Sequence, residues 1–145
     1  MSSHILIFPL ISGLIAQAIK FFIKSNNQSF KLKNIFAYSG MPSGHSAMVV
    51  SLATIIGFEE GVSTSLFALS TILAVIVIRD AVGIRKYLGQ HGKILNILVK
   101  DLAEDKMLDE EYPRLLEHIG HTPAQVFVGS LLGFAVSLVG YFLFF

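Results

Sequence analysis

The chain has 145 residues, of which 53% are hydrophobic and 14% are charged, and its mean hydropathy is +0.67. A soluble domain of average composition is less hydrophobic, so we expect one integral membrane domain over residues 1–145. Cysteine is absent, which excludes disulfides, thiolate metal sites and cysteine nucleophiles. The formal net charge of +1 argues neither for nor against a nucleic-acid partner, and we expect none.

Four apolar segments predict an all-α bundle of four transmembrane helices. They cover about residues 5–23, 44–58, 63–80 and 123–145. Three of them come close to or exceed the roughly 20 residues that a spanning helix needs. The second is equally apolar but short, so its flanking residues are expected within the headgroup layer or slightly deeper. The connections between spans then include residues 24–43 and 81–122.

The long connection divides into two parts. Residues 87–102 predict an amphipathic helix in the membrane interface, because apolar side chains recur at near-helical spacing: Leu88, Ile94, Leu95, Leu98 and Leu102. Residues 104–117 are acidic and contain Pro113, which predicts a shorter capped segment. Its carboxylates are interpreted as a solvated face, with a weak Mg²⁺ site as the alternative: Glu104, Asp105, Asp109, Glu110 and Glu111. No metal or other cofactor is expected.

Positive charge is confined to one side of this topology. All 11 Lys and Arg residues, from Lys20 to Arg114, fall at or near the side that carries the two long connections. The positive-inside rule places those connections in the cytoplasm and both termini on the opposite side of a cell or organellar membrane.

Two helix starts on the cytoplasmic side each carry a histidine. Ser43 and Gly44 precede the second span, and His45 follows them. Thr122 and Pro123 open the last span, directly after His121. Each start offers free N–H groups that can hold an anion, and a lone Ser-Gly-His would be interpreted as a simple cap. Because topology brings both starts to one face, we expect them to converge on one phosphate.

Further ionisable residues are expected on the same face. Lys20 ends the first span and is interpreted either as a phosphate ligand or as a side chain that snorkels to the headgroups. Arg79 and Asp80 end the third span, as functional groups or as a structural ion pair, and Arg85 follows as a phosphate ligand or an attractor of anionic lipid.

Small residues line one face of the last span. Gly129 and Gly133, extended by Ser137, allow close approach of a neighbouring helix. We interpret this face as packing within the bundle, although a homo-oligomer is also compatible with the sequence.

These motifs resemble a known superfamily. Residues 42–47, Pro-Ser-Gly-His-Ser-Ala, and residues 120–133, Gly-His-Thr-Pro-Ala-Gln-Val-Phe-Val-Gly-Ser-Leu-Leu-Gly, are similar to the second and third signature motifs of the type 2 phosphatidic acid phosphatase superfamily. That superfamily includes lipid phosphatases and vanadium haloperoxidases. Residues 79–86, Arg-Asp-Ala-Val-Gly-Ile-Arg-Lys, followed by residues 89–96, Gly-Gln-His-Gly-Lys-Ile-Leu-Asn, resemble its compact divergent branch.

The resemblance implies a metal-independent hydrolysis in two steps. His121 attacks phosphorus to form a phosphohistidine, and His45 protonates the leaving alkoxide. The non-transferred oxygens would be held by positive charge and N–H donors, as phosphoryl transfer requires. The implied phosphate ligands are Lys20, Ser43, the Gly44 backbone and an arginine, either Arg79 or Arg85.

The third motif departs from the superfamily pattern at two positions. An arginine is usual six residues before the histidine and an aspartate four after it, where this chain has Leu115 and Gln125. Gln125 can fix the imidazole tautomer but cannot stabilise an imidazolium as a carboxylate does. Asp80 is the first candidate for that task, and Glu117 is the second if the turn before His121 is helical.

We therefore predict a membrane lipid phosphate phosphatase whose active face is cytoplasmic. Its membrane phospholipid substrate is phosphatidylglycerol phosphate or phosphatidic acid, with a slight preference for the first. The alternatives are a catalytically inactive lipid-phosphate binder or scaffold, a prenyl diphosphate phosphatase, and a small transporter.

Overall fold

In the computed structural model, which describes residues 4–23, 40–104, 112–117 and 119–144, the chain is all-α. The described ranges contain helices and no strand. The helices are α1 (His4–Phe22), α2 (Gly44–Glu59), α3 (Ser65–Val82), α4 (Ile84–Glu104) and α5 (Pro123–Phe144). The chain is therefore a membrane helical bundle, as its sequence predicts.

Length and hydropathy identify the spanning helices. α1, α5 and the stretch Ser65–Leu102, which begins with α3, are long and apolar enough to cross a membrane, and α2 is a shorter apolar helix. Many large apolar side chains of α1, α3 and α5 are exposed, among them Leu14, Leu69 and Phe127. That exposure suits a bundle whose outer surface faces lipid rather than water.

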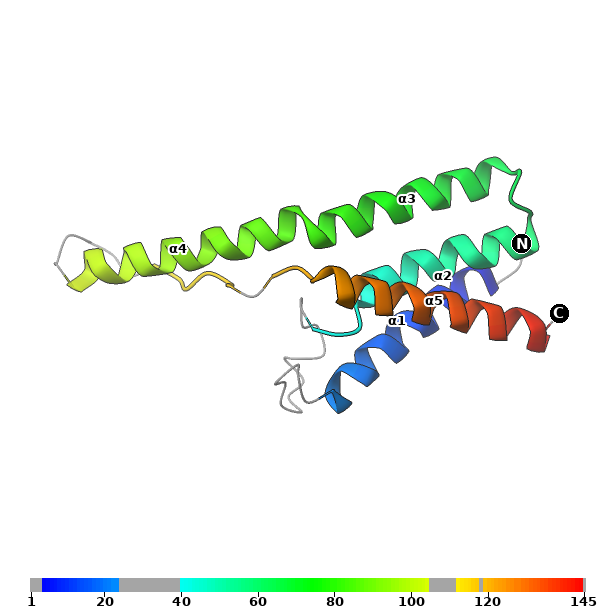
Figure 1. The fold of residues 1–145 in the computed structure, drawn as a ribbon, viewed down its shortest axis with the longest axis horizontal. Coiled ribbons are helices and arrows are strands. Elements are labelled where there is room, and N and C mark those ends of the chain that lie inside the picture. Colours follow the sequence, from blue (N-terminus) through cyan, green and yellow to red (C-terminus); the bar gives the residue numbers. More distant parts are fainter. Residues whose placement is uncertain (1–3, 24–39, 105–111, 118, 145) are drawn as a thin grey trace.

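α2 lies at the centre of the bundle and runs parallel to α5 (Figure 1). A Cβ atom added at Gly129 or Gly133 would collide with the backbone of α2, so the two helices touch without intervening side chains. One turn further, the Ser51 and Ser137 hydroxyls lie 2.7 Å apart. The contacts advance four residues at a time on both helices: Ser43 with Gly129, Ala47 with Gly133, and Ser51 with Ser137. The predicted packing of this small-residue face inside the bundle is confirmed.

α4 continues beyond the bundle along the direction of α3 (Figure 1). The helix predicted over residues 87–102 is confirmed and extends over Ile84–Glu104. Its large apolar side chains stay exposed, including Leu88, Ile94 and Leu98. The position of this helix in the membrane interface stays a prediction.

The structure of the acidic segment differs from the capped segment that was predicted over residues 104–117. Residues 105–111, with Asp105, Asp109, Glu110 and Glu111, lie outside the described residues. Residues 112–117 form no helical turn. The physical reason is that the Leu115 N–H and carbonyl bond to the side chain of Asn96 on α4 instead of to their own turn.

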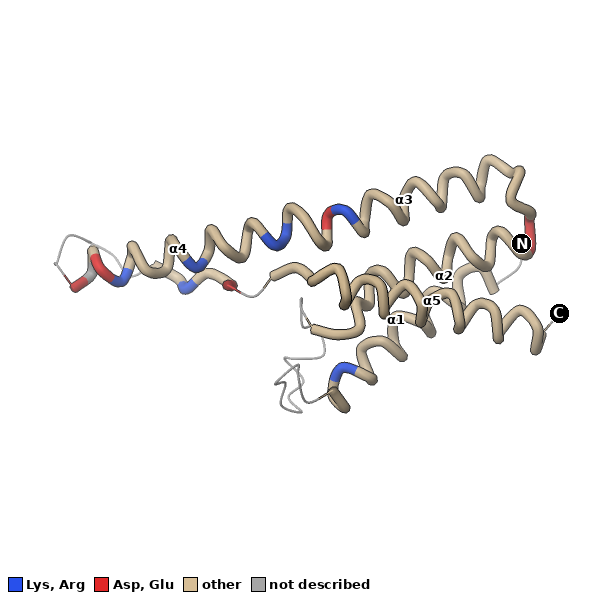
Figure 2. The backbone as a smooth tube through the Cα atoms, viewed as in Figure 1, with Lys and Arg blue, Asp and Glu red and all other residues tan. Residues whose placement is uncertain are grey.

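The described Lys and Arg residues lie away from the end of the molecule that holds both termini (Figure 2). Acidic residues of the turn between α2 and α3 lie near those termini. This arrangement agrees with the predicted topology, whose orientation in the membrane stays a prediction.

Candidate functional site

The site forms where α2 and α5 begin side by side. The backbone N–H of Ser43 donates to the carbonyl of Gln125 at 3.0 Å, which ties the cap of α2 to the first turn of α5. Because the two helices are parallel, the positive ends of both dipoles lie on the same face. The two helix starts thus lie together in the fold, and their binding of a phosphate stays a prediction.

Ser43 is the N-cap of α2. Its Oγ accepts a hydrogen bond from the Ser46 N–H at 3.4 Å and another from the Ser46 hydroxyl at 2.9 Å. Ser43 is fully buried, and Gly44 behind it is buried as well. A Cβ atom at Gly44 would meet only Gln17 at 3.9 Å, which is ordinary contact. Steric crowding therefore does not require a glycine at position 44.

A capping box opens α5. The Gln125 N–H donates to Thr122 Oγ1 at 3.3 Å, and the Thr122 N–H donates to Gln125 Oε1 at 3.0 Å. This reciprocal pair satisfies two N–H groups at the helix start. It also fixes the orientation of the Gln125 amide, because only the oxygen can accept from Thr122.

The fixed amide determines the tautomer of His121. Gln125 Oε1 lies 3.3 Å from His121 Nδ1, and an amide oxygen can only accept. Nδ1 of the neutral ring therefore carries the hydrogen, and Nε2 keeps its lone pair. His121 is 4% exposed, and its backbone N–H donates to the Ala81 carbonyl at the end of α3 at 2.9 Å. The ring is held in the form that a nucleophile requires.

Burial, and after it the nearby charge of Lys20, lower the pKa of His121 to about 4. Hydrogen bonds to the Gln125 side chain and the Gly40 backbone act in the opposite direction. The imidazole is therefore neutral at pH 7.

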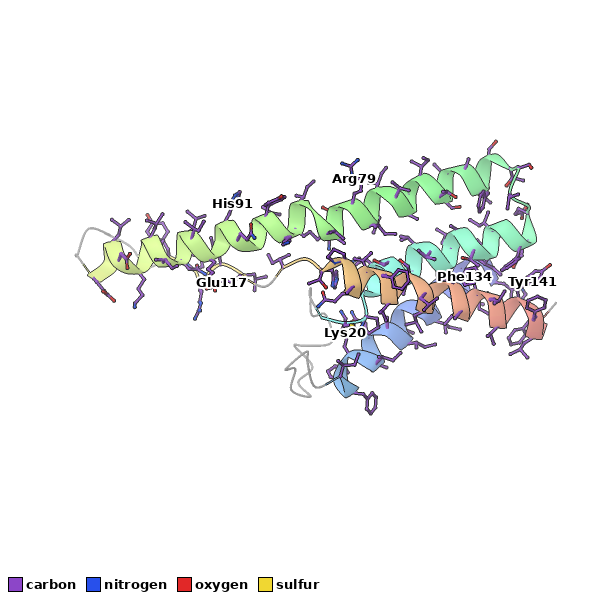
Figure 3. All side chains as sticks on the ribbon, viewed as in Figure 1. Lys20, Arg79, His91, Glu117, Phe134 and Tyr141 are labelled. Atoms are coloured by element: carbon purple, nitrogen blue, oxygen red, sulfur yellow. The ribbon has the colours of Figure 1, made fainter. Side chains whose placement is uncertain are left out.

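Lys20 and His45 complete the centre of the site. Lys20 is 3% exposed in the last turn of α1, and its charge acts on both His45 and His121. Figure 3 shows its side chain extending from α1 toward the start of α5. His45 is exposed, in contrast to the buried His121. The site thus combines an exposed histidine with a buried histidine and a buried lysine.

The end of α3 supplies an ion pair. Arg85 Nε and Asp80 Oδ2 are bonded, and both side chains are 31% exposed. Their charges act on His45. Asp80 was the first candidate from the sequence to stabilise the imidazolium of His121; in the fold it is paired with Arg85, and its charge acts on His45.

Arg79 is not brought to the site. α3 turns Ser70, Ala74 and Ala81 inward, and Arg79 precedes Ala81 by two residues, which is about 200° around a helix. Its side chain is exposed and points away from α2 and α5 (Figure 3). The alternative ion pair of Arg79 with Asp80 is therefore wrong, since the partner of Asp80 is Arg85.

Glu117 and Arg114 bond to each other instead of to His121. Arg114 Nη2 lies 3.3 Å from Glu117 Oε1, which also accepts from Asn96 Nδ2 at 2.9 Å. The turn before His121 is not helical, so Glu117 does not serve as its partner in the way a helical turn would allow.

The hydrogen bonds of Asn96 to Leu115 and Glu117, in the segment that precedes His121, were not predicted from the sequence. The spacing of Gly89, Gly92 and Asn96, which places all three on one face of a helix, was the available signal. Across residues 4–23, 40–104, 112–117 and 119–144, no group of three His, Asp or Glu side chains is arranged to hold a metal ion. Metal independence stays a prediction.

Comparison with known proteins agrees with this architecture. The model of the Divergent PAP2 family matches residues 1–136. The chain is also 38% identical to the uncharacterized membrane protein YuiD of Bacillus subtilis (strain 168) over 148 residues, covering 91% of this chain and 92% of that protein. No solved structure matches the chain.

Proposed function

Because the chain belongs to the Divergent PAP2 family, we propose that it hydrolyses the phosphate monoester of a membrane lipid at the joint start of α2 and α5. The observation that carries the proposal is the pairing of a buried, neutral His121 with an exposed His45 beside the buried cation of Lys20. A nucleophile, a proton donor and positive charge for the phosphoryl oxygens are the groups that this hydrolysis requires.

In the first step, Nε2 of His121 attacks phosphorus, and the bond from phosphorus to the lipid oxygen breaks. His45 gives its proton to that oxygen, so the lipid leaves as a neutral alcohol. In the second step, water attacks the phosphohistidine while His45 takes a proton from it. The phosphorus–nitrogen bond breaks, inorganic phosphate leaves, and both histidines return to their starting states.

The remaining groups hold the phosphoryl oxygens. Lys20 and Arg85 supply positive charge, and the start of α2 supplies N–H donors at Gly44. Ser43 contributes mainly by capping that start, because its oxygen already accepts two bonds from Ser46. Arg79 takes no part in this scheme.

The substrate is a lipid because the site lies at the end of apolar helices. Phosphatidylglycerol phosphate and phosphatidic acid are the two proposed substrates, and a cytoplasmic face suits the first slightly better. In this orientation both termini lie on the opposite side of the membrane.

The test is phosphate release from detergent-mixed phosphatidylglycerol phosphate, phosphatidic acid and a prenyl diphosphate, with and without EDTA. We expect release that survives EDTA, is lost in His121→Ala and leaves a trapped phosphohistidine when the wild type is quenched rapidly in alkaline detergent, where the phosphorus–nitrogen bond is stable. Arg79→Ala serves as the matched control and keeps full activity. Binding without release from any lipid would favour a lipid-phosphate binder, and release that is indifferent to His121→Ala would refute the mechanism.

A further inference from the structure

The segment before α5, residues 112–117 and 119–122, lies against α4 with almost no side chains between them. We call it the pre-α5 segment. A Cβ atom at Gly89 would lie 2.6 Å from the Glu117 carbonyl oxygen, and one at Gly92 would lie 2.8 Å from that of Leu116. Both glycines are buried, although the rest of α4 is mostly exposed. One face of α4 is therefore shaped to receive this segment.

Asn96 bonds to the pre-α5 segment with both ends of its amide. Its Nδ2 donates to the Leu115 carbonyl and to Glu117 Oε1, each at 2.9 Å. Its Oδ1 accepts from the Leu115 N–H, also at 2.9 Å. These bonds satisfy the N–H and the carbonyl of Leu115, in a segment that has no regular secondary structure of its own.

The other end of the pre-α5 segment is attached beside the site. Gly120 has a φ of +93°, and a Cβ atom there would lie 2.7 Å from the Lys86 backbone nitrogen. The next residue, His121, donates its N–H to Ala81. The segment is thus held at Asn96 and again at Ala81, near the end of α3, about 22 Å away along the two helices.

We propose that Asn96 is a positioning residue, which holds the pre-α5 segment on α4 and thereby sets the place of the His121 ring between Lys20 and Gln125. His121 stands outside α5, so the backbone that carries it is fixed from one side by the capping box and from the other by this segment. The effect on turnover rests on the proposed function, whereas the effect on the ring does not.

Two variants test the role of Asn96. Asn96→Ala removes all three bonds. Asn96→Asp keeps the shape of the side chain and the acceptor for Leu115 but loses both donors, so it serves if Asn96→Ala does not fold. His91→Ala is the matched control, because His91 is exposed on α4 and points away from the side that carries Glu117 (Figure 3).

The first readout is the NMR titration of the His121 imidazole in detergent. In the Asn96 variants we expect the pKa of His121 to move from about 4 toward the ordinary 6.5, because the ring loses its fixed burial. The second readout is turnover of a lipid phosphate, where kcat falls about tenfold to a hundredfold while KM changes less than about twofold. His91→Ala leaves both readouts unchanged.

An unchanged His121 titration in a folded Asn96 variant would overturn the proposal, whatever the activity. If the wild type releases no phosphate, the proposed function fails, and the titration still decides whether Asn96 positions the ring. A fall in kcat without any change in the titration would also overturn it, since Asn96 would then act by another route.

Discussion

Gln125 Oε1 lies 3.3 Å from Nδ1 of His121 and 3.0 Å from the backbone nitrogen of Thr122, so one oxygen both caps α5 and orients the catalytic candidate. The superfamily pattern has an aspartate at this position. An amide keeps the geometry of that contact without its charge. The protonated form of His121 is therefore stabilised less by Gln125 than it would be by an aspartate.

Gln125→Glu should raise the pKa of His121 by adding a negative charge beside Nδ1. Glutamate also suits a capping box, so the start of α5 is kept. We expect the acid limb of the profile of kcat/KM against pH to move upward by about 1 to 3 pH units. Gln125→Met is the control, because it lacks an acceptor and should lower activity without that displacement. An acid limb that stays in place in Gln125→Glu would show that residue 125 does not interact with the nucleophile.

His121 should make stability depend on pH. Its pKa is about 4 in the folded protein and 6.5 in an ordinary histidine, so the unfolded chain binds more protons between these values. The stabilisation is fully present above pH 6.5 and is lost as the pH falls toward 4, by about 3 kcal/mol in total. Unfolding midpoints in detergent at several pH values, compared with His121→Asn, measure it. Equal pH dependence in both proteins would contradict the burial of a neutral ring.

The variants Gly129→Ala and Gly44→Ala should differ sharply in stability. A methyl group at Gly129 collides with the carbonyl of Ser43, whereas one at Gly44 meets only ordinary contacts. We expect Gly129→Ala to destabilise the bundle by about 1 to 3 kcal/mol and to lower activity, because α2 and α5 are forced apart at the site. Gly44→Ala should unfold at the wild-type midpoint. Equal stability of the two variants would mean that the helices do not meet at Gly129.

Arg85→Ala should weaken activity far more than Arg79→Ala. Arg85 is half-buried and bonded to Asp80, whose charge acts on His45, whereas Arg79 points outward. Removal of Arg85 leaves Asp80 without its partner and takes positive charge from the site, so we expect KM for a lipid phosphate to rise about tenfold or more. Steady-state kinetics on both variants check this. A larger effect of Arg79→Ala would mean that Arg79, and not Arg85, supplies positive charge to the site.

The helices could be predicted because their signals are local. The apolar runs and the serine, threonine and proline at the helix starts act on neighbouring residues, so α2 and α5 begin where the sequence indicated. Topology then implied that both histidines share a face, and the electrostatic coupling of His45 with His121 agrees with it. The small-residue face at Gly129 and Gly133 could also be predicted, because a four-residue spacing places both glycines on one side of a helix.

The rotation of a helix about its axis and the path of an irregular segment could not be predicted from the sequence. Arg79, Asp80 and Arg85 all lie near the end of one span, and only the packing of Ala74 and Ala81 against the bundle determined which of the charged residues faces the site. The place of Glu117 depended on Asn96, which lies 21 residues away.

The sequence by itself therefore determined the membrane class, the helices and the identity of the two histidines, since these follow from composition and local caps. Only the tertiary structure decided which arginine joins Asp80, which tautomer His121 adopts and how the pre-α5 segment is held. Those features arise from contacts between elements far apart in the chain, whose energies depend on orientation as well as on residue type.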